Sequence, residues 1–216
     1  MNDHLKLKDV LNSRVTSKVL ADPIKPLPPY GLERSEVDEW LSSAGQAPFH
    51  HQAERSHKAS LSSPVPWRMY KFDALNCREL LTYLNENTDA GKICNMLAAS
   101  EAMVLATWTP DAANDDLSEN ILFEGTERNM EHVAAASAAV QNLLLLATEA
   151  GWRTYWSTGG VLRTPQIFNR YNISNSEILL GAIFIYPQDV GDAEIRKGKL
   201  CDARGNVSDW SRWVTN

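Results

Sequence analysis

The chain has 216 residues, 44% of them hydrophobic, which is enough to build one domain with a substantial core. Its 21 basic and 27 acidic residues give a net charge of −6. This acidic balance argues against a general nucleic-acid binder and against a protein that binds anionic membranes. We therefore expect a single domain over residues 1–216, with neither nucleic acid nor membrane among its partners.

The sequence lacks the usual signals for export. No apolar run approaches the ~20 residues needed to span a bilayer, and the charged start "MNDHLKLKDVLNSR" has no apolar core of a signal peptide. The cysteines Cys77, Cys94 and Cys201 are odd in number and scattered, which is typical of reduced thiols. These features predict a cytoplasmic protein.

The first part of the chain predicts two helices separated by a segment that prolines keep irregular. Residues 3–14 have the apolar spacing of a short amphipathic helix. Four prolines then fall within seven residues, from Pro23 to Pro29, and exclude regular structure there. A second helix begins near Ser35, its expected N-cap, and ends before Pro48.

The middle of the chain alternates between strands and helices. Residues 66–72 alternate in polarity as a strand does, and residues 101–110 form a short apolar strand that a proline ends. Residues 76–89 and 91–100, which lie between these strands, are expected to be helical. Residues 111–120 are a polar, acidic connection.

Residues 129–151 give the strongest helix prediction, because Ala and Leu dominate and Gly151 stops the helix. Its second half is apolar nearly all round, as in a central or subunit-interface helix. A strand and turn follow at 152–160, then a helix beginning near Pro165, and a strand at 177–187. Without G-x-G-x-x-G or G-K-[ST] motifs, these elements predict an α+β domain with a sheet flanked by helices.

Three of the five histidines, His50, His51 and His57, lie within eight positions of one another. Their spacing does not bring several ligands to one point, so we favour a solvated loop over a metal site. Residues 53–65 continue this loop as a polar, serine-rich stretch.

Two small basic clusters flank the fold. Arg14, Thr16 and Lys18 alternate, so in an extended segment their side chains point the same way and suit a phosphate. Lys197 and Lys199 also alternate around a glycine. Charge runs are usually solvated faces, which is the alternative for both clusters. Residues 157–160, "STGG", suit contact with a planar ligand, or else form an ordinary turn.

The order of these motifs is informative. The chain runs from R-x-T-x-K through "AP" with a polar loop, "PWR" before a strand, a long Ala/Leu helix, a glycine-rich turn and a strand ending in "YP" to K-x-K-L. This order, over roughly residues 8–202, resembles the nitroreductase family of FMN-dependent oxidoreductases. The resemblance implies a nitroreductase-like α+β fold, with a central, mostly antiparallel sheet, in a domain-sharing homodimer.

The resemblance also implies roles for individual residues. The early motif of the family holds the phosphate and ribityl chain of FMN, and the late basic pair completes the phosphate site, with Arg196 as a substitute if the alignment slips by one. A loop from the partner subunit wraps the flavin, and the glycine-rich turn packs on the ring and donates to N5. The residues implied to bind the cofactor are Arg14, Val15, Thr16, Lys18, Pro48, Phe49, His50, Gln52, Ser157, Thr158, Gly159, Gly160, Lys197 and Lys199.

Some residues depart from the family pattern. Phe49 and Gln52 replace a serine and an asparagine of the loop, and Gly159 stands where some members carry an acidic residue. Residues 53–65 are an insertion in the loop, and residues 203–216 form a tail that we expect to contact the partner. His50 and His51 are expected near the flavin.

The implied activity is hydride transfer from NAD(P)H through FMN to a nitroaromatic, quinone or enone acceptor, with no catalytic acid or base singled out. Three alternatives stay open. The chain is an FMN-dependent enzyme of the dehydrogenase or dehalogenase branch, a flavin-binding protein without turnover, or an unrelated α+β domain that binds no flavin.

Overall fold

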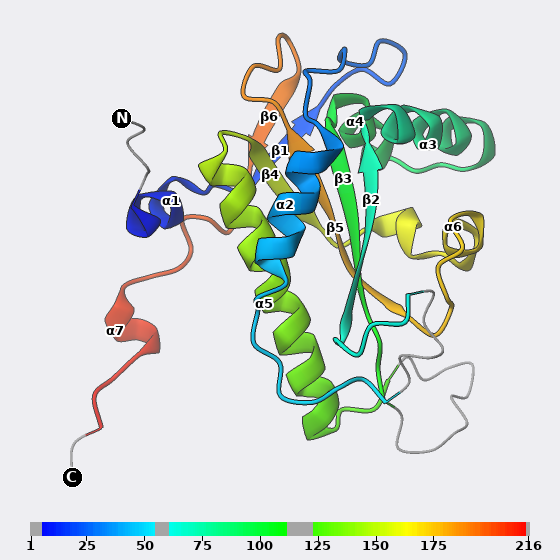
Figure 1. The fold of residues 1–216 in the computed structure, drawn as a ribbon. Coiled ribbons are helices and arrows are strands. Elements are labelled where there is room, and N and C mark those ends of the chain that lie inside the picture. Colours follow the sequence, from blue (N-terminus) through cyan, green and yellow to red (C-terminus); the bar gives the residue numbers. More distant parts are fainter. Residues whose placement is uncertain (1–5, 55–60, 112–122, 215–216) are drawn as a thin grey trace.

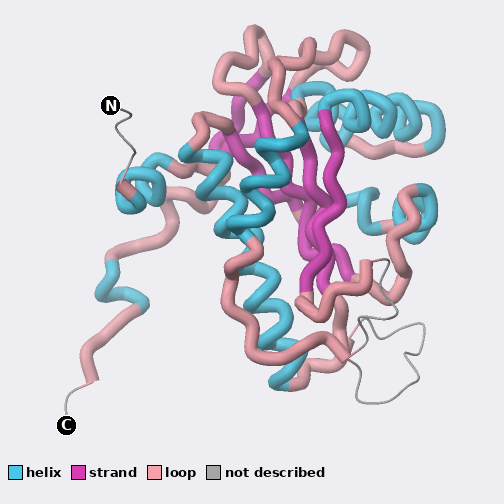
Figure 2. The backbone as a smooth tube through the Cα atoms, in the orientation of Figure 1, coloured by secondary structure: helices cyan, strands magenta, loops and turns pink. Residues whose placement is uncertain are grey.

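The computed structural model describes residues 6–54, 61–111 and 123–214. Its centre is a four-stranded antiparallel sheet in the order β2-β3-β5-β4 (Figures 1 and 2). The strands are β2 (Trp67–Asp73), β3 (Ala102–Trp108), β4 (Arg153–Ser157) and β5 (Ile178–Tyr186). The mostly antiparallel sheet that the family resemblance implies is therefore present.

Helices cover both faces of this sheet. One face packs against α2 (Arg34–Ala44) and α5 (Glu127–Glu149) through residues such as Val104 and Ile183. The other face packs against α3 (Ala74–Asn87), α4 (Lys92–Ala99) and α6 (Pro165–Arg170) through residues such as Leu105 and Phe184. Because both faces are covered, every residue of β3 is buried, which explains why all of them but Thr107 are apolar.

A second, two-stranded sheet joins the two ends of the chain. Strand β1 (Ser17–Leu20) pairs antiparallel with β6 (Glu194–Lys197), with Ser17 opposite Lys197. An isolated parallel bridge between Thr16 and Thr154 attaches this small sheet to β4, the edge strand of the large one. The first helix, α1 (Leu7–Ser13), comes just before β1 and contacts α5.

Helix α5 begins at Glu127, two residues before the predicted start, and ends just before Gly151 as predicted. The side chain of its N-cap, Thr126, accepts a hydrogen bond from the backbone N–H of Asn129, and Gly151 follows the helix with a φ of +86°. By length and composition α5 could cross a membrane, which differs from the expectation that no apolar run approaches that length. A buried core helix meets the same criteria, and α5 packs on the sheet through residues such as Leu143 and Ala147.

The structure also corrects the start of α2. Ser35 is not its N-cap, because the helix begins at Arg34 and Glu33, two residues before Ser35, caps it. The Glu33 side chain accepts from the third helical N–H, and the Glu36 side chain accepts from the N–H of Glu33. Glutamate can replace the usual short cap here because its carboxylate reaches the same amide.

Two short elements of the polar tail were not predicted from the sequence. Strand β6 is fully exposed, and the four-residue helix α7 (Val207–Trp210) buries no residue. After β6 the chain leaves the body of the protein, and Figure 1 shows α7 well separated from the sheet. Trp210 and Trp213 are 68% and 94% exposed. Most of the acidic connection 111–120, and residues 55–60 of the insertion, lie outside the described residues.

Candidate functional site

The pairing of β1 with β6 brings the two basic clusters of the sequence together. Arg14 and Val15, just before β1, and Lys197, at the end of β6, line one cavity of about 430 Å³. Gln141 of α5 also lines it. Two cations from opposite ends of the chain thus face one open space, as binding of an anion requires.

A close backbone contact holds together the two segments that carry Arg14 and Lys197. Gly198 donates its N–H to the carbonyl oxygen of Thr16 at 2.9 Å. A Cβ atom at Gly198 would lie 3.1 Å from the Thr16 Cβ and 3.3 Å from the Cys201 Sγ. Glycine therefore suits this close approach, since any larger residue would push Thr16 or Cys201 aside, and Thr16 takes part through its backbone.

The charges of the cavity are partly neutralised within the chain. The Lys197 Nζ lies 2.8 Å from the Oδ1 of Asp202, and this hydrogen bond raises the pKa of Lys197. Arg204 adds a third cation to the lining. Arg204 was not among the predicted ligands, because only the path of the chain after β6 brings it to this cavity.

Other predicted phosphate ligands point elsewhere in this single chain. The Lys18 Nζ lies 4.8 Å from the centre of the Tyr155 ring, in a cation–π contact. Arg196 pairs with Glu194 on the same strand, with the Nε and Oε1 atoms 2.5 Å apart. Lys199 is exposed in the turn after β6. Arg14 and Lys197, and not the complete motifs, are the residues that this cavity brings together.

The glycine-rich turn follows β4, on the edge of the large sheet to which β1 attaches. Ser157 ends β4, and Gly159 and Gly160 have φ angles of +99° and +53°. The N–H of Gly159 donates to the Ser157 Oγ at 3.2 Å. Ser157 lies about 10 Å along β4 from Thr154, the partner of Thr16, so the turn and the basic cavity share one edge. Thr158 is exposed in this turn.

The predicted flavin-wrapping loop lies at the opposite end of α5. Pro48, Phe49, His50 and Gln52 are all exposed. The Phe49 ring meets Trp67 edge to face, with the ring centres 5.7 Å apart. The cavity residue Gln141 lies about 20 Å along α5 from Arg128, which contacts the loop. Within one chain, the loop and the basic cavity are therefore separate.

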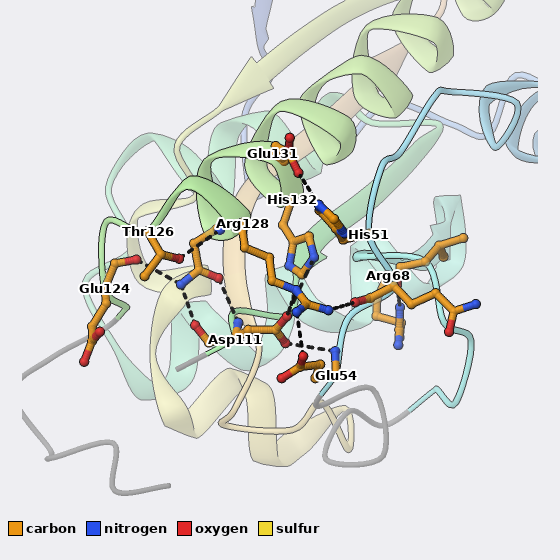
Figure 3. Close-up of polar contacts among 12 residues, drawn as sticks. His51, Glu54, Arg68, Asp111, Glu124, Thr126, Arg128, Glu131 and His132 are labelled. Atoms are coloured by element: carbon orange, nitrogen blue, oxygen red, sulfur yellow. Dashed lines mark hydrogen bonds and ion pairs between the residues drawn. The ribbon is translucent and has the colours of Figure 1, made fainter. Parts of the chain in front are cut away.

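A polar network holds this loop against the first turns of α5 (Figure 3). Its members are His51, Gln52, Glu54, Asp111, Arg128, Asn129, Glu131 and His132. The His51 Nε2 lies 3.1 Å from the Glu131 Oε2. His57 lies outside the described residues.

His132 is the most enclosed titratable group of this network. It is 1% exposed, and its Nε2 lies 3.8 Å from the Oδ2 of Asp111. Burial lowers the pKa of His132, and the nearby Asp111 carboxylate opposes this shift only in part. Burial therefore favours the neutral form of His132.

Searches against protein-family models and against curated proteins found no match. Solved structures do match. A nitroreductase-like family protein from Bacillus cereus is 19% identical, with all of both chains covered and a TM-score of 0.66. A protein from Staphylococcus epidermidis, assigned as an NAD(P)H:FMN oxidoreductase, is 20% identical, with a TM-score of 0.60 over 99% of this chain and 97% of its own.

A third structure shows a protein assigned as a nitroreductase from Desulfovibrio desulfuricans in complex with FMN. It is 14% identical, with a TM-score of 0.60 over 98% of both chains. These identities establish the fold alone. The resemblance seen in the order of the sequence motifs is confirmed at that level, and the chain has the fold of the nitroreductase-family proteins.

Proposed function

We propose that this protein is an FMN-dependent oxidoreductase that takes hydride from NAD(P)H and passes it to a nitroaromatic, quinone or enone acceptor. The observation that carries the proposal is the meeting of Arg14 and Lys197 at one cavity. A phosphate dianion suits two or more cations in a partly enclosed site. FMN, which is bound in one solved structure of the same fold, has such a phosphate.

The residues present fit this cofactor. Arg14, Lys197 and Arg204 would hold the phosphate, with Val15 and the Thr16 backbone beside it, and Gly198 allows the close approach of the two strands that brings these residues together. The turn 157–160 would contact the flavin ring, since it lies on the same sheet edge. When bound, FMN supplies the redox chemistry, and the chain supplies binding, orientation and electrostatics.

We also propose that the protein acts as a homodimer. The loop 48–52 and the basic cavity are separated along α5, so one cofactor in the cavity needs the loop of a second copy. The exposed Trp210 and Trp213, on a tail that leaves the domain, support a partner contact by residues 203–216. We place this dimer in the cytosol, because its three cysteines are free thiols.

The first experiment is an absorption spectrum of the purified protein after incubation with FMN and desalting. We expect a retained flavin spectrum, which Arg14→Ala and Lys197→Ala should each weaken. Arg34→Ala is the control, because Arg34 is an exposed cation that pairs with Asp73, away from the cavity. Failure of the wild-type protein to retain FMN would rule out the proposed function.

A second candidate is a flavin-binding protein without turnover. It is supported by Phe49, whose ring packs on Trp67, and by Gly159, whose N–H is already bonded to Ser157. Anaerobic mixing of the FMN-loaded protein with NADH and with NADPH separates the two functions. Bleaching followed by reoxidation with a quinone or nitroarene supports the reductase. In an FMN-dependent dehydrogenase or dehalogenase the flavin would be bleached, but quinones and nitroarenes would not reoxidise it. Flavin that is retained but not bleached supports the second candidate.

A further inference from the structure

Arg128 occupies a position that is unfavourable for a cation. It is the second residue of α5, after the N-cap Thr126, where the N–H groups of the first turn make the helix end positive. A cation there is repelled by the positive end of the helix dipole. Nearby anions or acceptors must offset this repulsion, and in the structure they belong to the loop and to the segment after β3.

The Arg128 guanidinium contacts three separate groups (Figure 3). Its Nη1 donates to the Glu54 Oε1 at 2.5 Å, and its Nη2 donates to the carbonyl oxygen of Gln52 at 3.2 Å. Its Nε lies 2.9 Å from the Oδ2 of Asp111. The fixed fork of an arginine side chain is suited to hold several acceptors in one geometry, which a lysine cannot do.

Asp111 connects Arg128 to the loop backbone. The Asp111 side chain is 7% exposed, and its Oδ1 accepts the backbone N–H of Glu54 at 2.9 Å. Asn129 holds Asp111 from both sides, since its Oδ1 accepts the Asp111 N–H and its Nδ2 donates to the Asp111 carbonyl. A buried carboxylate is stable when a cation and hydrogen bonds compensate it, so Arg128 and Asp111 depend on each other.

Further hydrogen bonds fix the base of the insertion. The N–H of Ala53 donates to the carbonyl oxygen of Pro64 at 3.0 Å, so the two ends of the insertion meet. Arg68, 2% exposed, donates to the carbonyl oxygens of Leu61, Ser63 and Val65 on the returning side. Arg128 holds Gln52 and Glu54, where the chain enters the insertion. The segment 51–54 is thereby placed by α5 instead of lying free in solvent.

We propose that Arg128 is a positioning residue that sets the conformation of residues 51–54, and through them presents Gln52 to the FMN of the second subunit. This inference rests on the proposed function, since it takes Gln52 as a cofactor contact. Arg128 bonds to the backbone of Gln52 and leaves the Gln52 side chain exposed. A shift of about 1 Å in a positioning segment is enough to change a rate roughly a hundredfold.

The test compares Arg128→Ala and Arg128→Lys with the wild type, and with Arg34→Ala as a matched control. Arg34 also lies in the first turn of a helix and pairs with an aspartate, but it contacts no part of the loop. The dissociation constant for FMN, the split between KM and kcat, and hydrogen exchange of the amides at 51–54 are measured. Urea unfolding reports whether each variant folds.

We expect Arg128→Ala to raise the FMN dissociation constant at least roughly tenfold and to speed exchange at 51–54, with Arg128→Lys recovering part of both effects. Arg34→Ala should leave both unchanged. FMN binding within twofold of the wild type, or unchanged exchange at 51–54, would overturn the inference. If Arg128→Ala does not fold, Glu54→Ala removes one of the three contacts, and we expect a smaller effect in the same direction.

The failure of this inference is distinguishable from failure of the proposed function. If the wild type itself retains no FMN, the role toward the cofactor is overturned together with that function. If the wild type binds FMN and Arg128→Ala binds it equally well, only the positioning role is wrong.

Discussion

Gly198 donates its backbone N–H to the carbonyl oxygen of Thr16, and this bond continues the ladder between β1 and β6. The candidate phosphate site therefore consists of two segments that are far apart in sequence, and neither can form it alone. Arg14 precedes the ladder on one strand, and Lys197 ends it on the other. Changes that separate the strands should weaken anion binding before they unfold the main sheet.

The first prediction concerns Gly198. In Gly198→Val, the added side chain would displace Thr16, because even a Cβ would lie 3.1 Å from two of its atoms. We expect FMN retention to fall sharply, with the urea midpoint lowered only slightly because β6 is exposed. Gly125→Ala, where a Cβ meets nothing within 4 Å, is the control. Equal FMN retention by both variants would show that the Thr16 contact does not shape the site.

The second prediction concerns Asp202, whose carboxylate lines the cavity. Asp202 pairs with Lys197, so it competes with a bound phosphate for this cation. In Asp202→Asn the competing charge is gone, and we expect tighter binding of FMN, by a few-fold, at low ionic strength. Titration of the quenching of flavin fluorescence measures this. Weaker binding in Asp202→Asn would mean that Asp202 orients Lys197 toward the ligand.

The strongly patterned elements could be predicted from the sequence. Strand β5 is a bounded apolar run, and the Ala and Leu content of α5 leads to a stop at Gly151, so both elements were found close to their observed bounds. The contact between the two basic clusters was expected only through the family resemblance. Strand β6 has no buried residue, so no alternation of buried and exposed positions marks it as a strand. It is a strand because it pairs with β1.

The polar network around Arg128 could not be predicted from local sequence. Asp111 follows β3, Glu54 follows the histidine pair, and Arg128 begins α5, so only the folded sheet and helix bring them together. Arg204 was missed for a similar reason, because its role depends on the path of the chain after β6. Glu33 was missed because capping rules favour shorter side chains.

The third prediction concerns thiol reactivity. Burial raises the pKa of Cys77 to about 12, and burial also raises the pKa of Cys94. Since the thiolate is the reactive form, Cys77 should not react with Ellman's reagent at pH 8 in the folded protein. Cys201 is partly exposed and should react first. Mass spectrometry of the labelled protein identifies the site, and Cys201→Ser should abolish the fast phase. Labelling of Cys77 in the folded protein would contradict the structure.

The last prediction concerns the pH dependence of stability. Burial lowers the pKa of His132 in the folded protein below its value of about 6.5 in the unfolded chain. Between these two values the unfolded chain binds a proton at this site and the folded protein does not. The free energy of unfolding must therefore fall as the pH drops below about 6.5 toward the folded pKa, and His132 adds no slope above about pH 7.5.

Replacing His132 by glutamine removes this titration but keeps a polar side chain beside Asp111. We expect His132→Gln to show a smaller loss of stability than the wild type between pH 7.5 and 5.5, in urea unfolding without cofactor. Each tenfold difference in proton affinity between the two states corresponds to about 1.4 kcal/mol. His50→Gln, at an exposed position, is the control. The same pH slope in wild type and His132→Gln would mean that the folded protein admits the proton at His132, for instance by pairing it with Asp111.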